Sequence, residues 1–254
     1  MSTNLVIGYP QVGFDGTILT STTASAGYEA NRTTLGSRQD RFQTSANVTT
    51  SIIDFDYGST IAPDFFYIGR ANLLYLSDSS DPVVSLIGAS DSAFTTPTNY
   101  NVTLDISRLV GSSDEDMIEF PLSTAAFQYW RVKAATTASF QHSYSKIAFG
   151  NVLDFGVDPL HPRTIERKFN NSKLSRRTNF GFEFNWAGIT NALRSQFDDS
   201  IGAYKDVMTL YLMTRYYHEV LCDARVVPCR ILSYRWTPQE IGLNNLTISF
   251  EEVI

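Results

Sequence analysis

The chain has 254 residues, of which 43% are hydrophobic, 18% charged and 13% aromatic, and its formal net charge is -6. A chain of this length can bury a core without disulfides, and a low charged share with many Phe and Tyr residues is typical of β-sheets. The positive charges are scattered and no apolar run approaches the roughly 20 residues that cross a bilayer. These features argue against nucleic acid as a partner and against membrane insertion.

The N-terminus and the cysteines indicate where the chain is made. The opening Met-Ser-Thr-Asn lacks the charged start and apolar centre of a signal peptide, and the only cysteines are Cys222 and Cys229. Two cysteines are too few for a disulfide framework. We therefore expect assembly in a cytoplasm, with both thiols reduced and buried.

Residues 1–45 are polar, rich in Thr, Ser and Gly, and contain only brief apolar pieces such as Leu5–Ile7. A segment of this composition is stable only when it leans on other structure. We predict an extended N-terminal arm that either wraps its own domain or reaches a neighbouring subunit.

Residues 46–156 contain short apolar runs separated by turn-forming residues. The clearest alternation is in 53–57, where Ile53, Phe55 and Tyr57 share one face, and in 129–134, where Trp130 points inward. No helical periodicity lies between the runs. Further strands are predicted at 65–68, 83–87, 102–106, 118–120 and 147–149. The spacing favours an antiparallel β-sandwich.

The two prolines in Asp158–Pro162 interrupt strand pairing, so we place a domain boundary near residue 156. The second domain, 157–254, contains an aromatic strand with Phe180, Phe182, Phe184 and Trp186 on one face. The following residues, 189–197, have the period of an amphipathic helix. Later strands are predicted at 207–213, 226–232 and 246–251. This pattern indicates a small sheet that packs against one helix.

The order of these pieces resembles a known family. An acidic strand ends in glycine at 53–58, and it is followed by 64–72, 84–94, the aromatic strand 129–132 and a strand with glycine at 146–150. This arrangement is similar to the galactose-binding-like jelly rolls of the coagulation factor 5/8 type C, or discoidin, kind. The resemblance implies an antiparallel jelly-roll β-sandwich over roughly 50–155.

The whole layout also resembles tail and baseplate proteins of tailed bacteriophages. The carrying features are the jelly roll, the Arg-rich stretch, the aromatic strand with its helix, and a closing strand that ends in Phe250-Glu-Glu252. The resemblance implies a structural protein of the virion tail, one that is not an enzyme. It would form a ring with copies of itself and bind other tail proteins. The alternative is a receptor- or carbohydrate-binding module that binds a host surface glycan.

Two groups of residues could carry chemistry, although both favour a structural interpretation. His142 lies beside Ser143 and Ser145, as a serine hydrolase would need, but neither serine has the surrounding motif of a nucleophile. His218, Cys222 and Cys229 offer zinc ligands but no fourth. We therefore predict no catalytic residue and no zinc site.

Charged loops offer two further hypotheses. The acidic stretches 78–81 and 114–116 could hold a structural calcium ion, which is the one cofactor we consider, although solvated turns are the ordinary state of such loops. The basic loop 163–177 could meet an acidic patch on another subunit or remain solvated. Its candidate interface residues are Arg163, Arg167, Lys168, Lys173, Arg176 and Arg177.

Tyrosines are frequent throughout the first part of the chain. They could form a sugar-stacking platform or a set of subunit contacts, and most are expected in the core. The residues considered are Tyr9, Tyr28, Tyr57, Tyr67, Tyr75 and Tyr100.

Overall fold

A computed structural model describes most of the chain. The described residues are 5–10, 17–33, 41–73, 83–102, 105–110, 114–168, 178–204, 209–218 and 224–252. They form two compact units: unit 1 comprises Met1–Val12 and Val152–Ile254, and unit 2 comprises Gly13–Asn151. We expected divisions after residues 45 and 156, whereas the units divide the chain after residues 12 and 151. Unit 2 is therefore inserted between the two parts of unit 1.

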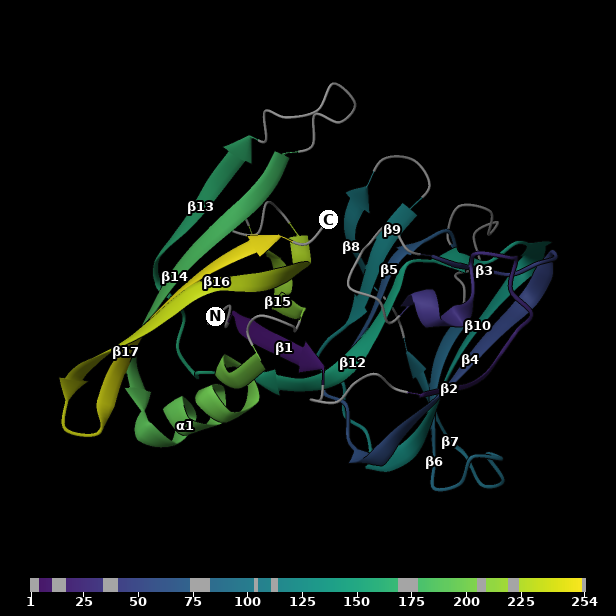
Figure 1. The fold of residues 1–254 in the computed structure, drawn as a ribbon, viewed down its shortest axis with the longest axis horizontal. Coiled ribbons are helices and arrows are strands. Elements are labelled where there is room, and N and C mark those ends of the chain that lie inside the picture. The colour runs from purple at the N-terminus through teal and green to yellow at the C-terminus, as the bar shows by residue number, and fades with distance from the viewer. Residues whose placement is uncertain are drawn as a thin grey trace. The chain divides into compact units, whose positions relative to one another are not determined.

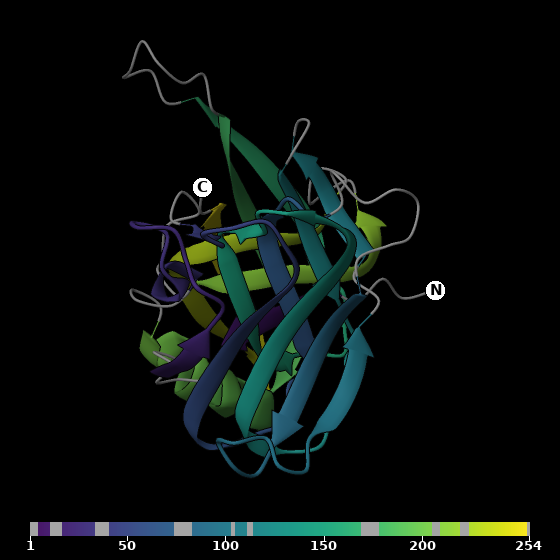
Figure 2. The same cartoon turned by 90° about the vertical axis from the view of Figure 1, so that its right-hand side faces the viewer.

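The first sheet of unit 2 has five antiparallel strands in the order β2-β4-β10-β6-β7, and Figure 2 looks onto it. Its centre is β10, which pairs with β4 on one side and β6 on the other. Trp130, Val132 and Ala134 of β10 are buried, which confirms the predicted inward face. The strands are β2 (Thr17–Ser21), β4 (Val48–Ile61), β6 (Val83–Ala89), β7 (Thr98–Val102) and β10 (Phe127–Phe140).

The second layer of unit 2 pairs its strands in the order β12-β5-β9-β8, and a small ladder joins β11 to β3. Aromatic residues from both layers meet in one core. Phe55 lies edge-on to Phe149 at 5.7 Å, and Trp130 lies at 6.0 Å from the same ring. The strands are β3 (Phe42–Gln43), β5 (Phe65–Ala71), β8 (Asp105–Val110), β9 (Asp114–Glu119), β11 (Ser143–Tyr144) and β12 (Lys146–Leu153). The predicted antiparallel β-sandwich is confirmed.

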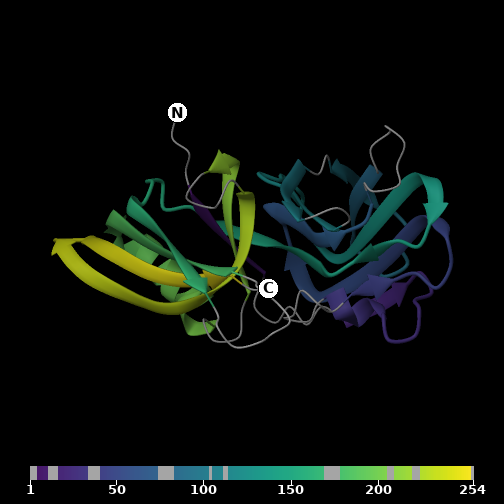
Figure 3. The same cartoon turned by 90° about the horizontal axis from the view of Figure 1, so that it is seen from above.

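Unit 1 contains antiparallel strands in the order β13-β14-β17-β16-β15-β1 (Figure 1). Figure 3 shows the length and curvature of the hairpin of β16 and β17, drawn in yellow. The N-terminal strand β1 pairs with β15, so Leu5–Ile7 is buried. The strands are β1 (Val6–Pro10), β13 (Leu160–Lys168), β14 (Thr178–Thr190), β15 (Leu210–His218), β16 (Ala224–Glu240) and β17 (Leu243–Glu252).

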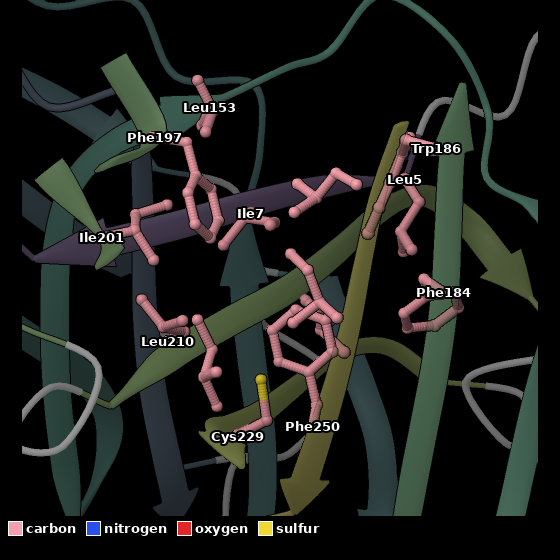
Figure 4. Packing of buried hydrophobic residues seen from close by; sticks show 14 of the residues in the cluster. Leu5, Ile7, Leu153, Phe184, Trp186, Phe197, Ile201, Leu210, Cys229 and Phe250 are labelled. Atoms are coloured by element: carbon pink, nitrogen blue, oxygen red, sulfur yellow. The ribbon is translucent and has the colours of Figure 1, made fainter. Parts of the chain in front are cut away.

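The predicted helix is α1 (Asn191–Ser200), which follows β14 directly. The Thr190 side chain accepts a hydrogen bond from the Leu193 backbone N–H, which is the N-cap geometry that ends a strand and begins a helix. Phe197 of α1 is fully buried. It belongs to the same hydrophobic core as Phe184 and Trp186 of the aromatic strand (Figure 4). The predicted pairing of a small sheet with one helix is therefore confirmed.

The N-terminal residues differ from the expected irregular arm. Two strands, β1 and β2, lie within it, and a short 3₁₀ helix at Ala30–Thr33 follows. The reason is burial: Leu5, Val6 and Ile7 gain more from pairing with β15 than an extended arm could give them. In the described part of the chain, no helix is long and apolar enough to span a membrane.

Candidate functional site

His142 does not lie with the serines beside it in sequence. Its Nδ1 is 2.8 Å from Ser51 Oγ and its Nε2 is 3.0 Å from Thr136 Oγ1. Ser145 Oγ instead donates to the Gly69 carbonyl, and Ser143 Oγ has no partner among the described residues. Ser51 and His142 are both fully buried. A serine and a histidine that no substrate can reach are a structural pair.

The hydrogen bonds assign the proton on this histidine. Thr136 Oγ1 donates to the Ala138 carbonyl and Tyr144 Oη donates to Ser51 Oγ. Thr136 must then accept from Nε2–H, and Ser51 must donate to Nδ1. The neutral imidazole satisfies every group. Burial accordingly lowers the pKa of His142 from 6.5 to about 4. We call Ser51, Thr136, His142 and Tyr144 the polar core.

The candidate zinc ligands are not brought together. His218 pairs with Ala224 at one end of the β15–β16 ladder, and Cys229 pairs with Leu210 at the other. Cys229 is fully buried, as predicted, and burial raises the pKa of its thiol. Cys222 lies outside the described residues. No group of three potential metal ligands occurs in the described part of the chain.

The acidic stretches do not form a described calcium site. Residues 114–116 belong to strand β9 and not to the loop that we expected, because they pair with Leu109 and its neighbours on β8. Residues 78–81 lie outside the described residues. Calcium stays a hypothesis for both stretches.

The basic loop is shorter than we predicted. Arg163, Arg167 and Lys168 lie in strand β13, where Arg163 is in register with Glu183 and Lys168 with Thr178. Pairing with β14 extends the hairpin into the stretch that we assigned to a loop. The other candidate interface residues, Lys173, Arg176 and Arg177, lie outside the described residues. The predicted role of all six at a subunit interface stays a prediction.

Most of the tyrosines considered are core residues. Tyr9 and Tyr67 are buried, and Tyr57 and Tyr100 pack against the core of unit 2. Tyr28 differs, because 43% of it is exposed. Tyr75 lies outside the described residues. Among the described tyrosines of this set, Tyr28 is therefore the most exposed.

Hydrogen bonds link three residues with amide side chains to one another and to the backbone of Tyr28. The Gln43 backbone N–H donates to the Tyr28 carbonyl, and Gln43 Nε2 donates to Gln141 Oε1 at 2.8 Å. Asn72 Nδ2 donates to the Gln141 carbonyl at 2.9 Å. All three amide side chains are half-buried. We call Gln43, Asn72 and Gln141 the amide cluster.

The fold positions the amide cluster at one end of the sandwich. Strand β12 runs from Lys146, which pairs with Gly69, toward Gly150, which pairs with Phe65 and precedes the end of unit 2. Asn72 and Gln141 flank the Lys146 end, so the cluster lies at the end of unit 2 opposite Asn151. Loops at the end of a rigid sandwich are a common place for binding residues.

Hydrogen bonds of the neighbouring residues hold the amide cluster in place. The His142 backbone N–H donates to Thr44 Oγ1, the Thr44 N–H donates to the His142 carbonyl, and the Ser143 N–H donates to Asn72 Oδ1. His142 of the polar core thus fixes the short link between β10 and β11 that carries Gln141. An amide has two N–H donors and an oxygen with two lone pairs, and the described contacts use one of these positions on the Gln43 side chain. Such groups suit ligands with hydroxyls, which also donate and accept.

Sequence patterns did not identify the amide cluster. Gln43, Asn72 and Gln141 are isolated polar residues at strand ends, and turn residues of this kind occur throughout the chain. The pairing of Gln43 with Gln141 joins positions 98 residues apart. The antiparallel pairing of β3 with β11 brings them together.

Comparison with known proteins gives two similar solved structures. One is the crystal structure of chitosan-binding module 1 from a chitosanase/glucanase of Paenibacillus sp. IK-5, with 20% identity and a TM-score of 0.38, covering 56% of this chain and 98% of the module. The other is a selenomethionine-labelled mutant of the same module, with 17% identity and a TM-score of 0.39, covering 56% of this chain and 99% of the module. Likenesses this weak leave the function to be decided by the residues of this chain.

No protein-family model and no curated protein matches the sequence. Neither similar structure is described as a virion component. The expected place in a phage tail, and the expectation that the chain is not an enzyme, therefore stay predictions.

Proposed function

We propose that unit 2 is a non-catalytic carbohydrate-binding module and that the amide cluster with Tyr28 is its binding site. The observation that carries this proposal is the Gln43–Gln141 pair, two half-buried amides held by a fixed hydrogen-bond network that includes the backbone of the exposed Tyr28. A sugar ring offers hydroxyls to the amides and an apolar face to an aromatic ring. Preorganised groups lose little entropy when the ligand binds.

The test is isothermal titration calorimetry of the full chain with chitosan hexasaccharide and with laminarihexaose, a neutral glucan. We expect Gln141→Ala to weaken binding about tenfold, because the variant loses the amide and frees Gln43. Gln196→Ala is the matched control, since Gln196 is an exposed glutamine on α1 in unit 1. A wild-type chain that binds neither oligosaccharide would refute the proposal.

A structural role for unit 1 is a second proposal, in which it contacts neighbouring subunits or other proteins of a phage tail. The supporting observation is Ile241, which is fully exposed in the turn between β16 and β17. Gly242 with φ 82° closes this turn, so the isoleucine is presented at the tip of a long hairpin. An apolar side chain in water is stabilised when it enters a pocket on a partner.

Analytical ultracentrifugation of the full chain over a range of concentrations tests this second proposal. We expect wild type to self-associate and Ile241→Asp to shift the protein toward monomer, while Glu240→Gln, next to it, has no effect. A wild-type chain that is monomeric throughout and absent from purified phage particles would exclude the structural role.

A further inference from the structure

The outward face of the five-stranded sheet carries a second group of polar residues, remote in sequence from the amide cluster. Along β10, Trp130 and Val132 point into the core, so Tyr129, Arg131 and Lys133 point outward, each half-buried. Alternate residues on one strand lie about 7 Å apart. The register places Asp56 beside Tyr129 and Asp54 beside Arg131. We call these five residues the sheet-face site.

Arg131 is fixed from two directions. Its Nε and Nη2 donate to the two oxygens of Asp54 at 2.7 and 2.9 Å, and Thr20 Oγ1 donates to Asp54 Oδ2 at 2.7 Å. The Phe94 ring covers the guanidinium, with its centroid 4.2 Å from Cζ. The Arg131 side chain is 29% exposed, whereas the Asp54 side chain is 4% exposed. The edge of the guanidinium that Asp54 does not occupy can still donate hydrogen bonds.

The loop that carries Phe94 is built to place this ring. Phe94 has a positive φ of 52°, a conformation that residues with a side chain rarely adopt. The Asp91 carboxylate holds the turn by accepting from the backbone N–H groups of Ala93 and Thr95. A backbone held against its preference is a reason to look for function at the group it positions. Here that group is the Phe94 ring, which lies over the outward-facing Arg131.

Tyr129, two residues before Arg131 on β10, has a hydrogen bond of its own. Gln128 Nε2 donates both to Asp56 Oδ1 at 2.9 Å and to Tyr129 Oη at 3.2 Å. Tyr129 is half-buried, so part of the residue remains open to solvent. A fixed guanidinium beside a tyrosine ring provides hydrogen-bond donors and a stacking surface at once.

The charges of the sheet-face site indicate the ligand class. The two cations, Arg131 and Lys133, are balanced by the two carboxylates, Asp54 and Asp56, which also accept hydrogen bonds. A balanced site offers no net attraction to a polyanion or a polycation. Polar groups that both donate and accept, arranged along a strand, match the hydroxyls of successive sugar rings.

We infer that the sheet-face site is a second carbohydrate site, which binds a neutral oligosaccharide across β4 and β10. It uses other residues than the amide cluster and does not depend on it. A purely structural role, in which the same contacts only hold the 90–97 loop against the sheet, predicts no ligand effect.

The experiment is calorimetry of the full chain with laminarihexaose and cellohexaose, two neutral hexasaccharides, together with hydrogen–deuterium exchange of the same complexes. We expect two ligands per wild-type chain, and ligand-induced protection of residues 90–97 and 127–133. Tyr129→Ala and Arg131→Lys should each weaken this second site about tenfold, because one loses the ring and the other the bidentate geometry. Neither removes a buried apolar residue, and urea unfolding checks that both fold.

Tyr28→Ala is the matched control, because it removes the tyrosine of the amide cluster and leaves the sheet-face site intact. Protection at 41–45 and 141–143 that persists in Tyr129→Ala shows a working amide cluster with a separate second site. The inference is overturned if both sheet-face variants bind as wild type, if 90–97 and 127–133 gain no protection, or if the face binds hexagalacturonate in preference to the neutral sugars. Protection of the sheet face alone would refute the proposed amide-cluster site and leave this one standing.

Discussion

The polar core around His142 and the ion pair of Asp54 with Arg131 are both polar clusters of unit 2, but they differ in charge and in exposure. The polar core is fully buried at His142 and Ser51 and carries no charge, because every donor has an acceptor when the imidazole is neutral. The ion pair keeps its charges and leaves Arg131 partly in water. A buried neutral network is sensitive to pH, whereas a half-exposed pair is sensitive to loss of a partner.

Loss of Arg131 should have the largest effect on stability. In Arg131→Ala, the almost fully buried Asp54 carboxylate loses its bidentate partner, so we expect the free energy of unfolding to fall by about 3 kcal/mol. Urea unfolding of the full chain measures the change. Lys133→Ala on the same face should change it by less than about 0.5 kcal/mol. Equal effects of the two substitutions would show that the ion pair has no special role.

Acid should act on the polar core through His142. The folded pKa of His142 is about 4, below its ordinary 6.5, so between these values the unfolded chain binds a proton that the folded chain does not. The free energy of unfolding should therefore fall as the pH falls from 6.5 toward 4, by up to about 3 kcal/mol from this group, and then level off. Protonated Nδ1 would face the Ser51 hydroxyl as donor to donor.

The control for the acid effect is His142→Gln, which does not titrate. Its unfolding free energy should lose this part of the pH dependence between pH 6.5 and 4, measured by urea unfolding at each pH. An unchanged slope in the variant would show that His142 is not the group responsible.

A substitution at Thr20 tests how much the third hydrogen-bond donor to Asp54 contributes to stability. Thr20→Val keeps the shape of the side chain and removes the hydroxyl that donates to Asp54 Oδ2. We expect a loss of about 1.5 kcal/mol in urea unfolding, the usual value for a hydrogen bond to a charged group. Thr17→Val, also on β2, is the matched control. A loss no larger than in the control would mean that water replaces the Thr20 hydroxyl.

The smallest effect should come from the ring over Arg131. Phe94→Leu retains an apolar cover but removes the aromatic face 4.2 Å from the guanidinium. We expect a loss of about 0.5–1 kcal/mol, the size of a partly exposed cation–π contact. In the background of Arg131→Met, which has no cation, the same substitution should cost less. A double-mutant cycle without coupling would contradict this contact.

Sequence periodicity predicted the elements that depend on local alternation. The inward face of Trp130, Val132 and Ala134 and the aromatic face of Phe182, Phe184 and Trp186 were both correct, because burying one side of a strand leaves a period of two in the sequence. The α1 helix followed from its period in the same way. The expected basic loop was wrong from 163 to 168, since hairpin length depends on pairing with β14 and leaves no such signal.

The mainly β class, the strands with one buried face and the helix all follow from local patterns in the sequence. Only the folded chain brings β1 to β15, Gln43 to Gln141, and Asp54 to Arg131 across 77 residues. The alternation along a strand shows which face is buried, whereas register and packing over the whole domain select the strand's partner. The candidate binding residues all belong to this second group.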